Sequence, residues 1–137
     1  MIDTNIIVSA ALYRNGGIAF LLEEILKKYE VCICDFSIEE LHIVMQNKFP
    51  GRINEMDDFL NELTYELIYT PKKINIENMP YVRDKKDYPI LAAAIAADVD
   101  VVLSGDKDLL TVEIERPEII NSKSFREKYL IDGTGEY

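Results

Sequence analysis

The sequence predicts a single α/β domain with a central parallel sheet that is flanked by helices on both faces. Two observations carry this prediction. Apolar runs of strand length alternate along the chain with segments of helical periodicity, which is typical of parallel sheets covered by helices. The chain has 137 residues, of which 48% are hydrophobic, so it has the size of one domain and enough apolar surface for a core. A disordered chain is thereby excluded.

Strands are expected at short apolar runs, and helices where apolar residues recur with a period of about 3.6 or where a capping residue opens the segment. The run Val31–Cys34 has the unbroken hydrophobicity of a strand buried on both faces. In chain order, the expected strands are Met1-Ile2, Val31–Cys34, Leu67–Tyr69, Val101–Leu103 and Glu118–Ile120. The expected helices are Asn5–Leu12, Ile18–Tyr29, Ser37–Phe49, Ile53–Glu66, Tyr88–Ala97 and Ser124–Leu130.

Helix-breaking residues separate these elements. Asn15-Gly16-Gly17 ends the first helical pattern, Pro50-Gly51 stops the third, and the polar stretch Pro71–Pro80 is typical of a loop. No repeat or linker divides the chain. We therefore predict one domain over residues 1–130, followed by a loose tail at 131–137.

The charge of the chain is one-sided, with 25 acidic and 15 basic residues and a net charge of −10. This disfavours a protein that binds nucleic acid through a basic surface. It is compatible with one that binds phosphates through metal ions, because bound cations invert the local charge. Cys32 and Cys34 are too close in sequence for an unstrained bridge, and a single histidine, His42, excludes a zinc site. Reduced thiols and the lack of a long apolar run predict a cytoplasmic protein without a membrane span.

Acidic residues follow the predicted strands at several places. Asp3 follows Met1-Ile2, Glu40 lies shortly after Val31–Cys34, Asp106 follows Val101–Leu103, and Asp87 opens the Ala-rich helix. Each could simply cap a helix, and Glu40 could complete a capping box with the serine three residues before it. Because ligands bind at the carboxyl ends of parallel strands, we expect these carboxylates to converge. Their repulsion would then raise at least one pKa and favour a bound Mg²⁺ or Mn²⁺.

Helix phase distinguishes the two neighbouring acids in the third helical pattern. At about 100° per residue, Glu40 lies on the flank of the apolar side, whereas Glu39 points towards solvent. His42 is interpreted as a surface residue. The short basic segment that contains Arg83, Lys85 and Lys86 is either a solvated loop or a contact for a phosphate backbone.

Four ordered segments resemble the PIN-domain family, and in particular its VapC-like toxins of toxin–antitoxin systems. The resemblance runs from Asp3 to about Ser122. The segments are Ile2-Asp3-Thr4-Asn5, Ile38-Glu39-Glu40-Leu41, Arg83-Asp84-Lys85-Lys86-Asp87 with the following Leu91-Ala92-Ala93-Ala94, and Ser104-Gly105-Asp106-Lys107-Asp108-Leu109-Leu110. The sequence departs from the family in its first strand, where only Met1 and Ile2 precede Asp3.

The resemblance implies a ribonuclease that depends on Mg²⁺ or Mn²⁺. It implies the catalytic acids and metal ligands Asp3, Glu40, Asp87 and Asp106, with Asp108 as a further ligand and Asn5 and Ser104 as supporting polar residues. It also implies an RNA substrate, an antitoxin protein as partner and a homodimer. Asp84 belongs to the third segment but is less often given a metal role in the family.

Three other functions remain open from the sequence. A phosphoryl-transfer enzyme with an aspartyl nucleophile is disfavoured, because Asp3-Thr4-Asn5 lacks the second Asp of the usual Asp-x-Asp pair. A receiver-like signalling domain also has an acidic Mg²⁺ pocket, but it requires an acid pair after its first strand, where Asp3 stands alone. The third is a PIN fold that binds a partner without catalysis.

Overall fold

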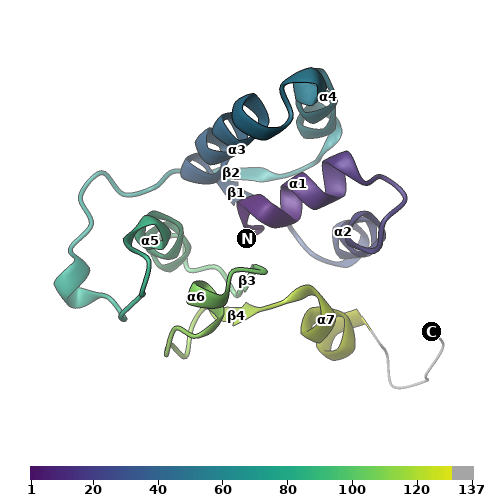
Figure 1. The fold of residues 1–137 in the computed structure, drawn as a ribbon. Helices are drawn as coiled ribbons and strands as arrows, with labels where there is room; N and C mark the ends of the chain where they lie inside the picture. The colour runs from purple at the N-terminus through teal and green to yellow at the C-terminus, as the bar shows by residue number, and fades with distance from the viewer. Residues whose placement is uncertain (131–137) are drawn as a thin grey trace.

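Short parallel strands and longer helices alternate in the computed structural model, which describes residues 1–130 (Figure 1). The described helices are α1 (Thr4–Leu12), α2 (Gly17–Lys28), α3 (Asp35–Lys48), α4 (Ile53–Glu62), α5 (Tyr88–Ala96), α6 (Lys107–Leu110) and α7 (Ser122–Phe125). The strands are β1 (Cys32–Cys34), β2 (Glu66–Ile68), β3 (Val101–Leu103) and β4 (Glu118–Ile120). The predicted mixed α/β class is confirmed. The tail expected at 131–137 lies outside the described residues.

The described strands form two separate parallel pairs. Strand β1 pairs with β2, and β3 pairs with β4. Residues 1–3 lie between the pairs: the Ile2 N–H donates to the Cys32 carbonyl at 3.0 Å, and the Asp3 N–H donates to the Leu103 carbonyl at 3.0 Å. This segment contributes one isolated parallel bridge, between Ile2 and Leu103. The single central sheet that we expected is therefore not observed, because the segment between the two pairs is too short to pair as a strand.

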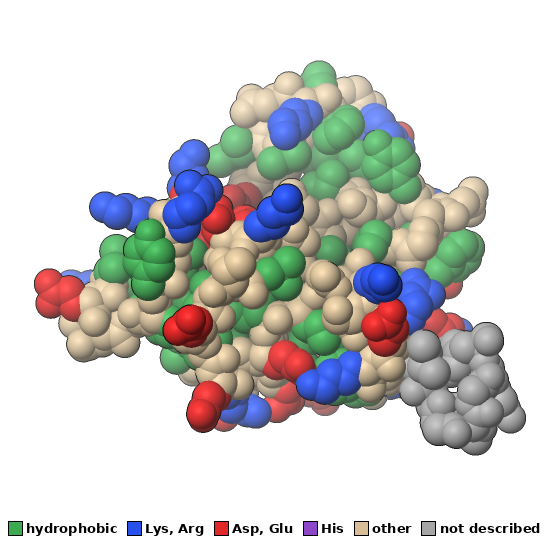
Figure 2. Space-filling model, turned by 60° about the horizontal axis from the view of Figure 1, so that its bottom comes forward, with side chains coloured by type: hydrophobic (Ala, Val, Ile, Leu, Met, Phe, Trp, Pro, Cys, Tyr) green, Lys and Arg blue, Asp and Glu red, His purple; other side chains and the backbone are tan. Residues whose placement is uncertain are grey.

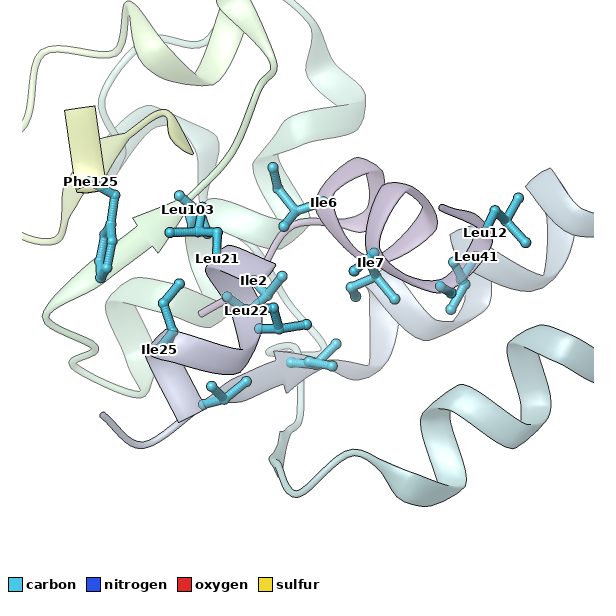
Figure 3. Close-up of a cluster of buried hydrophobic side chains, with 14 of the residues drawn as sticks. Ile2, Ile6, Ile7, Leu12, Leu21, Leu22, Ile25, Leu41, Leu103 and Phe125 are labelled. Carbon is cyan, nitrogen blue, oxygen red and sulfur yellow. The ribbon is translucent and has the colours of Figure 1, made fainter. Parts of the chain in front are cut away.

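The main core lies where α1 packs against α2, α3 and α4. Figure 3 shows Ile7 of α1, Leu21 of α2 and Leu41 of α3 among its buried side chains. Six residues of α1 are buried, so this short helix is apolar on most of its surface. In Figure 1, α1 to α4 lie on one side of the N-terminus, and α5, α6 and β4 on the other. Packing on several sides thus fixes α1, and with it the position of Asp3 at its start.

Helix α3 begins earlier than its sequence indicated. It starts at Asp35, directly after β1, instead of at Ser37. The Asp35 carboxylate accepts hydrogen bonds from the Phe36 N–H and from the N–H and hydroxyl of Thr70, and these bonds hold the start of the helix. Ser37 is fully buried inside the first turn, with its Oγ 3.3 Å from the Cys34 Sγ. The alternative interpretation of Ser37 and Glu40 as a capping box is therefore wrong.

Two other boundaries differ by a few residues. Helix α4 ends at Glu62, and β2 begins at Glu66, a residue that we expected to end the helix. The Glu66 N–H donates to the Val31 carbonyl at 2.9 Å, so pairing with the neighbouring strand takes this residue out of the helix. Cys32 and Cys34 are free cysteines.

The described chain contains no single helix that is both long and apolar enough to cross a membrane. Helices α1 and α2 meet the length and composition criteria only when taken together, and the two are bent by 109° relative to each other.

Candidate active site

Asp3 is buried at the junction between the two strand pairs. Its Oδ1 accepts a hydrogen bond from the Thr4 N–H at 2.8 Å and caps α1. Its Oδ2 accepts a hydrogen bond from the Ser104 hydroxyl at 2.6 Å. Burial raises the pKa of Asp3 despite these two bonds, and the nearby charge of Asp106 raises it further. The capping interpretation and a place in an acidic site therefore both apply to Asp3.

Glu40 reaches the same junction from α3. Its Oε1 accepts a hydrogen bond from the Thr4 hydroxyl at 3.0 Å. Burial raises the pKa of Glu40, and the charges of Asp3 and Asp106 add to this, while the bond from Thr4 and the charge of Lys86 oppose it. The neighbouring Glu39 is exposed, as the helix phase predicted.

Asp87 is buried with part of its carboxylate unpartnered. It is 8% exposed, and its Oδ2 has no hydrogen-bond partner. Burial raises the pKa of Asp87 to about 7, and the charge of Asp106 is the next cause, followed by those of Asp84, Asp3 and Asp108. A buried carboxylate oxygen without a donor is costly in a folded protein. Asp87 is therefore the least satisfied acid of the site.

The alternative interpretation, that Asp87 simply caps α5 through its side chain, is not supported. A short 3₁₀ turn, Lys85–Asp87, precedes the helix, so the backbone of Asp87 is already helical and its side chain makes no capping bond. Asp84 caps the turn instead, by accepting a hydrogen bond from the Lys86 N–H at 3.0 Å. The carboxylate of Asp87 is thereby left free for another partner.

Asp106 follows β3 and caps α6, where its Oδ1 accepts a hydrogen bond from the Asp108 N–H at 2.8 Å. Its own N–H donates to the Ser104 Oγ at 3.0 Å. The fully buried Ser104 hydroxyl thus donates to Asp3 and accepts from Asp106. The charge of Asp106 contributes to the raised pKa of Asp3 and of Asp87.

A second set of acids adjoins this group. Asp84, Asp87 and Asp108 each offer a carboxylate oxygen, and these oxygens lie within 4.8 Å of one another. Asp108 is held by the Arg83 guanidinium, whose two nitrogens donate to its two oxygens at 2.7 Å each. This bidentate pair lowers the pKa of Asp108. Asp87 therefore belongs both to the group around Asp3 and to this outer set.

Two residues near the site were missing from the ligands and supporting residues expected from the sequence. The Thr4 hydroxyl holds Glu40, a contact between residues 36 positions apart that no local pattern reveals. Asp84 lies beside Asp87, and its spacing of three residues could have indicated this, because side chains at that spacing eclipse in a 3₁₀ turn.

The other polar and basic residues considered in the sequence analysis are exposed. The Asn5 side chain is exposed at the start of α1. His42 is exposed on α3, with its Nε2 3.9 Å from an oxygen of Asp57, so it is a surface residue as expected. The basic side chains of Arg83, Lys85 and Lys86 are exposed next to the acids. On the face that Figure 2 shows, Lys and Arg side chains alternate with acidic ones and form no continuous basic surface.

The side chains of the site fit a small, hard divalent cation. The potential ligands are all oxygen atoms, which Mg²⁺ and Mn²⁺ prefer. The unpartnered Oδ2 of Asp87 needs a donor or a cation, and the pKa values of Asp3, Glu40 and Asp87 are all raised by burial and by neighbouring charges. A cation would relieve both the repulsion and the unsatisfied oxygen.

The fold and the site define an α/β protein with carboxylates collected at the ends of short parallel strands. The chain belongs to the PIN domain family, whose model matches residues 1–108. This range includes all the acids described above. PIN domains are generally nucleases and usually use divalent metals, which supports a nuclease at a coarse level. No curated protein and no solved structure matches the chain.

Proposed function

We propose that this PIN domain is a metal-dependent endoribonuclease that hydrolyses RNA phosphodiester bonds. The observation that carries the proposal is Asp87, a buried carboxylate with an unpartnered oxygen next to Asp3 and Asp106. Such an arrangement destabilises the fold unless a cation is bound, and natural proteins keep such destabilising groups mainly at functional sites.

The chain's own residues prepare the site for Mg²⁺ or Mn²⁺. We propose Asp3, Glu40, Asp87 and Asp106 as the residues that hold the metal, with Asp108 as an additional ligand. When bound, the cation lowers the pKa of a water molecule and neutralises charge that develops on the phosphate. Ser104 and the Thr4 N–H orient the Asp3 carboxylate, and this orientation is fixed before any ligand arrives.

Glu40 is placed to accept a proton. Burial raises its pKa above the ordinary value, and the Thr4 hydroxyl fixes one of its oxygens at 3.0 Å. A raised pKa makes a carboxylate a better proton acceptor. We therefore propose that Glu40 takes the proton of the attacking water as well as contributing to metal binding.

The choice of RNA, and a toxin role, rest on the resemblance of the four sequence segments to VapC-like toxins. We propose an antitoxin protein as a partner, and a second copy of the chain in a homodimer, on the same basis. The net charge of −10 favours a narrow substrate over general binding of nucleic acid, because the protein as a whole repels polyanions.

The test is cleavage of a labelled, mixed-sequence, single-stranded RNA by the purified protein. We expect cleavage with Mn²⁺ or Mg²⁺ and none with EDTA. Activity that persists in EDTA would rule out the metal-dependent mechanism. If the wild-type protein binds Mn²⁺ yet cleaves no RNA, the proposed ribonuclease activity is overturned. That result would favour a PIN domain that only binds its partner.

A further inference from the structure

Tyr81 is presented to solvent two residues before Arg83, whose side chain holds Asp108 of the candidate site. Its side chain is 76% exposed, the highest value among the described large hydrophobic residues. The next residue, Val82, is 2% exposed, and Arg83 is exposed again. Alternating exposure along a non-helical segment places Tyr81 and Arg83 on the same, outer side of the chain. Because Val82 points into the core, the side chain of Tyr81 points out to solvent.

The burial of Val82 ties this segment to the active site. Val82 packs with Tyr88 and Leu91 in a small core cluster. Its N–H also donates a hydrogen bond to the Tyr88 hydroxyl at 3.0 Å. Tyr88 directly follows Asp87 in the chain. The backbone that carries Tyr81 is thus anchored to the residue next to the most strongly perturbed acid.

Arg83 gives the second connection. Its guanidinium holds Asp108, one of the outer acids grouped with Asp87. The Tyr81 phenol is close enough to contribute to the raised pKa of Arg83, although Asp108 is the main cause. The exposed ring of Tyr81 is therefore followed, two residues on, by the Arg83 guanidinium, which contacts Asp108.

We propose that Tyr81 is a positioning residue on whose ring one base of a single-stranded RNA stacks, while Arg83 contacts the adjacent backbone phosphate. This inference rests on the proposed function and names the form of RNA that the site accepts. An exposed aromatic ring binds any base through its face, and a basic side chain beside it follows the phosphate backbone. A base in a duplex has its faces covered, so only an unpaired strand can use Tyr81 in this way.

Tyr13 provides a matched control. It is also strongly exposed, at 61%, but it lies at the C-terminal end of α1, whereas Asp3 lies at the N-terminal end of the same helix. Tyr81→Ala and Tyr13→Ala each remove one exposed aromatic ring. Only Tyr81 belongs to the segment that is hydrogen-bonded to Tyr88 through Val82 and continues into Arg83.

The experiment measures RNA affinity separately from cleavage. In a protein that carries Asp106→Asn, so that the RNA stays intact, fluorescence anisotropy gives the Kd for a single strand of about 12 nucleotides. We expect Tyr81→Ala to raise this Kd roughly tenfold, and Tyr81→Phe, which keeps the ring, to change it less than about twofold. Tyr13→Ala should behave like Tyr81→Phe. For a fully paired, blunt-ended duplex, Tyr81→Ala and its parent should agree within about twofold.

A spectroscopic readout distinguishes stacking from a merely structural role. With 2-aminopurine in the single strand, binding should change its fluorescence in the parent and in Tyr81→Phe, and this change should be lost in Tyr81→Ala. Melting temperatures of all variants confirm that each is folded.

The outcomes separate this inference from the proposed function. If wild type cleaves RNA with metal, but Tyr81→Ala and Tyr13→Ala have the same Kd, the stacking role is overturned and the nuclease stands. If Tyr81→Ala weakens single-stranded and duplex RNA equally, the role of Tyr81 is structural or electrostatic, and the proposal fails. If the protein neither binds nor cleaves any RNA, both proposals fail together.

Discussion

Three acids at the carboxyl ends of the parallel strands are held differently from the acids at the amino ends, whereas Asp108, also near the carboxyl ends, is paired with Arg83. At the carboxyl ends, Asp3, Glu40 and Asp87 are wholly or partly buried, have raised pKa values, and form no ion pair within residues 1–130. At the amino ends, the Lys128 ammonium holds Glu118 at 2.6 Å, and the Arg116 guanidinium holds the acids on either side of Val99 at 2.8 and 2.9 Å. The pKa of Glu118 is lowered, chiefly by the hydrogen bond from Lys128.

This contrast teaches that unbalanced charge, and not the size of a cavity, marks the candidate site. A cavity of about 1440 Å³ opens at the amino ends. Among the residues that line it, Glu118 pairs with Lys128, and Arg116 pairs with Asp100. None of the acids around Asp3 lines that cavity. Paired surface charges contribute little to stability, whereas buried unpaired ones destabilise the fold. Only the unpaired acids at the carboxyl ends therefore destabilise the fold in a way that a bound ligand would relieve.

The largest expected effect is loss of nuclease activity when the unpaired acids lose their charge. Asp3→Asn and Asp106→Asn keep the size of the side chain, and Asn caps a helix about as well as Asp. We expect both variants to fold and to lose RNA cleavage on the order of 100-fold or more. Asp100→Asn, at the amino ends, is the control and should cleave at the wild-type rate. An Asp106→Asn protein as active as wild type would contradict the proposed mechanism.

The second prediction concerns the free energy of unfolding as a function of pH, measured in EDTA. The folded-state pKa of Asp87, about 7, lies above the ordinary value of 3.8. Its proton therefore stabilises the fold below pH 3.8, and this contribution is lost as the pH rises through 7. The Asp87→Asn variant has no proton to lose at this position. Its free energy of unfolding, relative to that of wild type, should therefore increase between pH 5 and pH 8.

Urea unfolding at each pH measures this difference. One pKa unit corresponds to about 1.4 kcal/mol, and partial hydration of the folded state reduces the total, so we expect a relative gain of roughly 2 kcal/mol at pH 8. The control is Glu118→Gln. Because the pKa of Glu118 is lowered, its contribution is present at neutral pH, and its removal should leave no such gain. Parallel pH profiles for wild type and Asp87→Asn would contradict the assigned environment of Asp87.

Local sequence pattern predicted the elements that depend on local burial. The strands at Val101–Leu103 and Glu118–Ile120 have the predicted bounds, because each contains a short apolar run that polar residues limit on both sides. The orientation of Glu40 followed from helix phase, since its neighbour Glu39 is exposed. The roles of these acids in catalysis stay predictions.

Contacts between distant residues account for what the sequence did not reveal. Helix α3 starts at Asp35 because Thr70, 35 residues away, donates two hydrogen bonds to its carboxylate. A capping pattern could not show that Asp87 keeps an unpartnered oxygen, because a short turn takes over the start of the helix. Hydrogen bonds that depend on tertiary structure override local preferences in both cases.

The third prediction is that Mn²⁺ or Mg²⁺ stabilises the protein by binding the unpaired acids. At a concentration of 100 Kd, binding adds about 2.7 kcal/mol, which corresponds to a rise in melting temperature of roughly 9 °C for a chain of this length. The rise should be larger at pH 8 than at pH 6, because protons compete with the metal for Asp87, whose pKa is raised to about 7. Thermal melts with and without metal measure it. Asp87→Asn should lose most of the rise and Asp100→Asn none, and equal melts with and without metal would contradict a metal site.

The smallest expected effect is at the amino ends, where Arg116→Gln removes the cation that pairs with Asp98 and Asp100. All three side chains are largely exposed, so water and salt already screen their charges. We expect the melting temperature to fall by less than about 2 °C, and by less still in 0.5 M salt, where screening is stronger. RNA cleavage and the metal-induced rise in melting temperature should match wild type. If Arg116→Gln reduced either of them as strongly as Asp87→Asn, the two ends of the strands would be coupled, and the functional contrast between them would not hold.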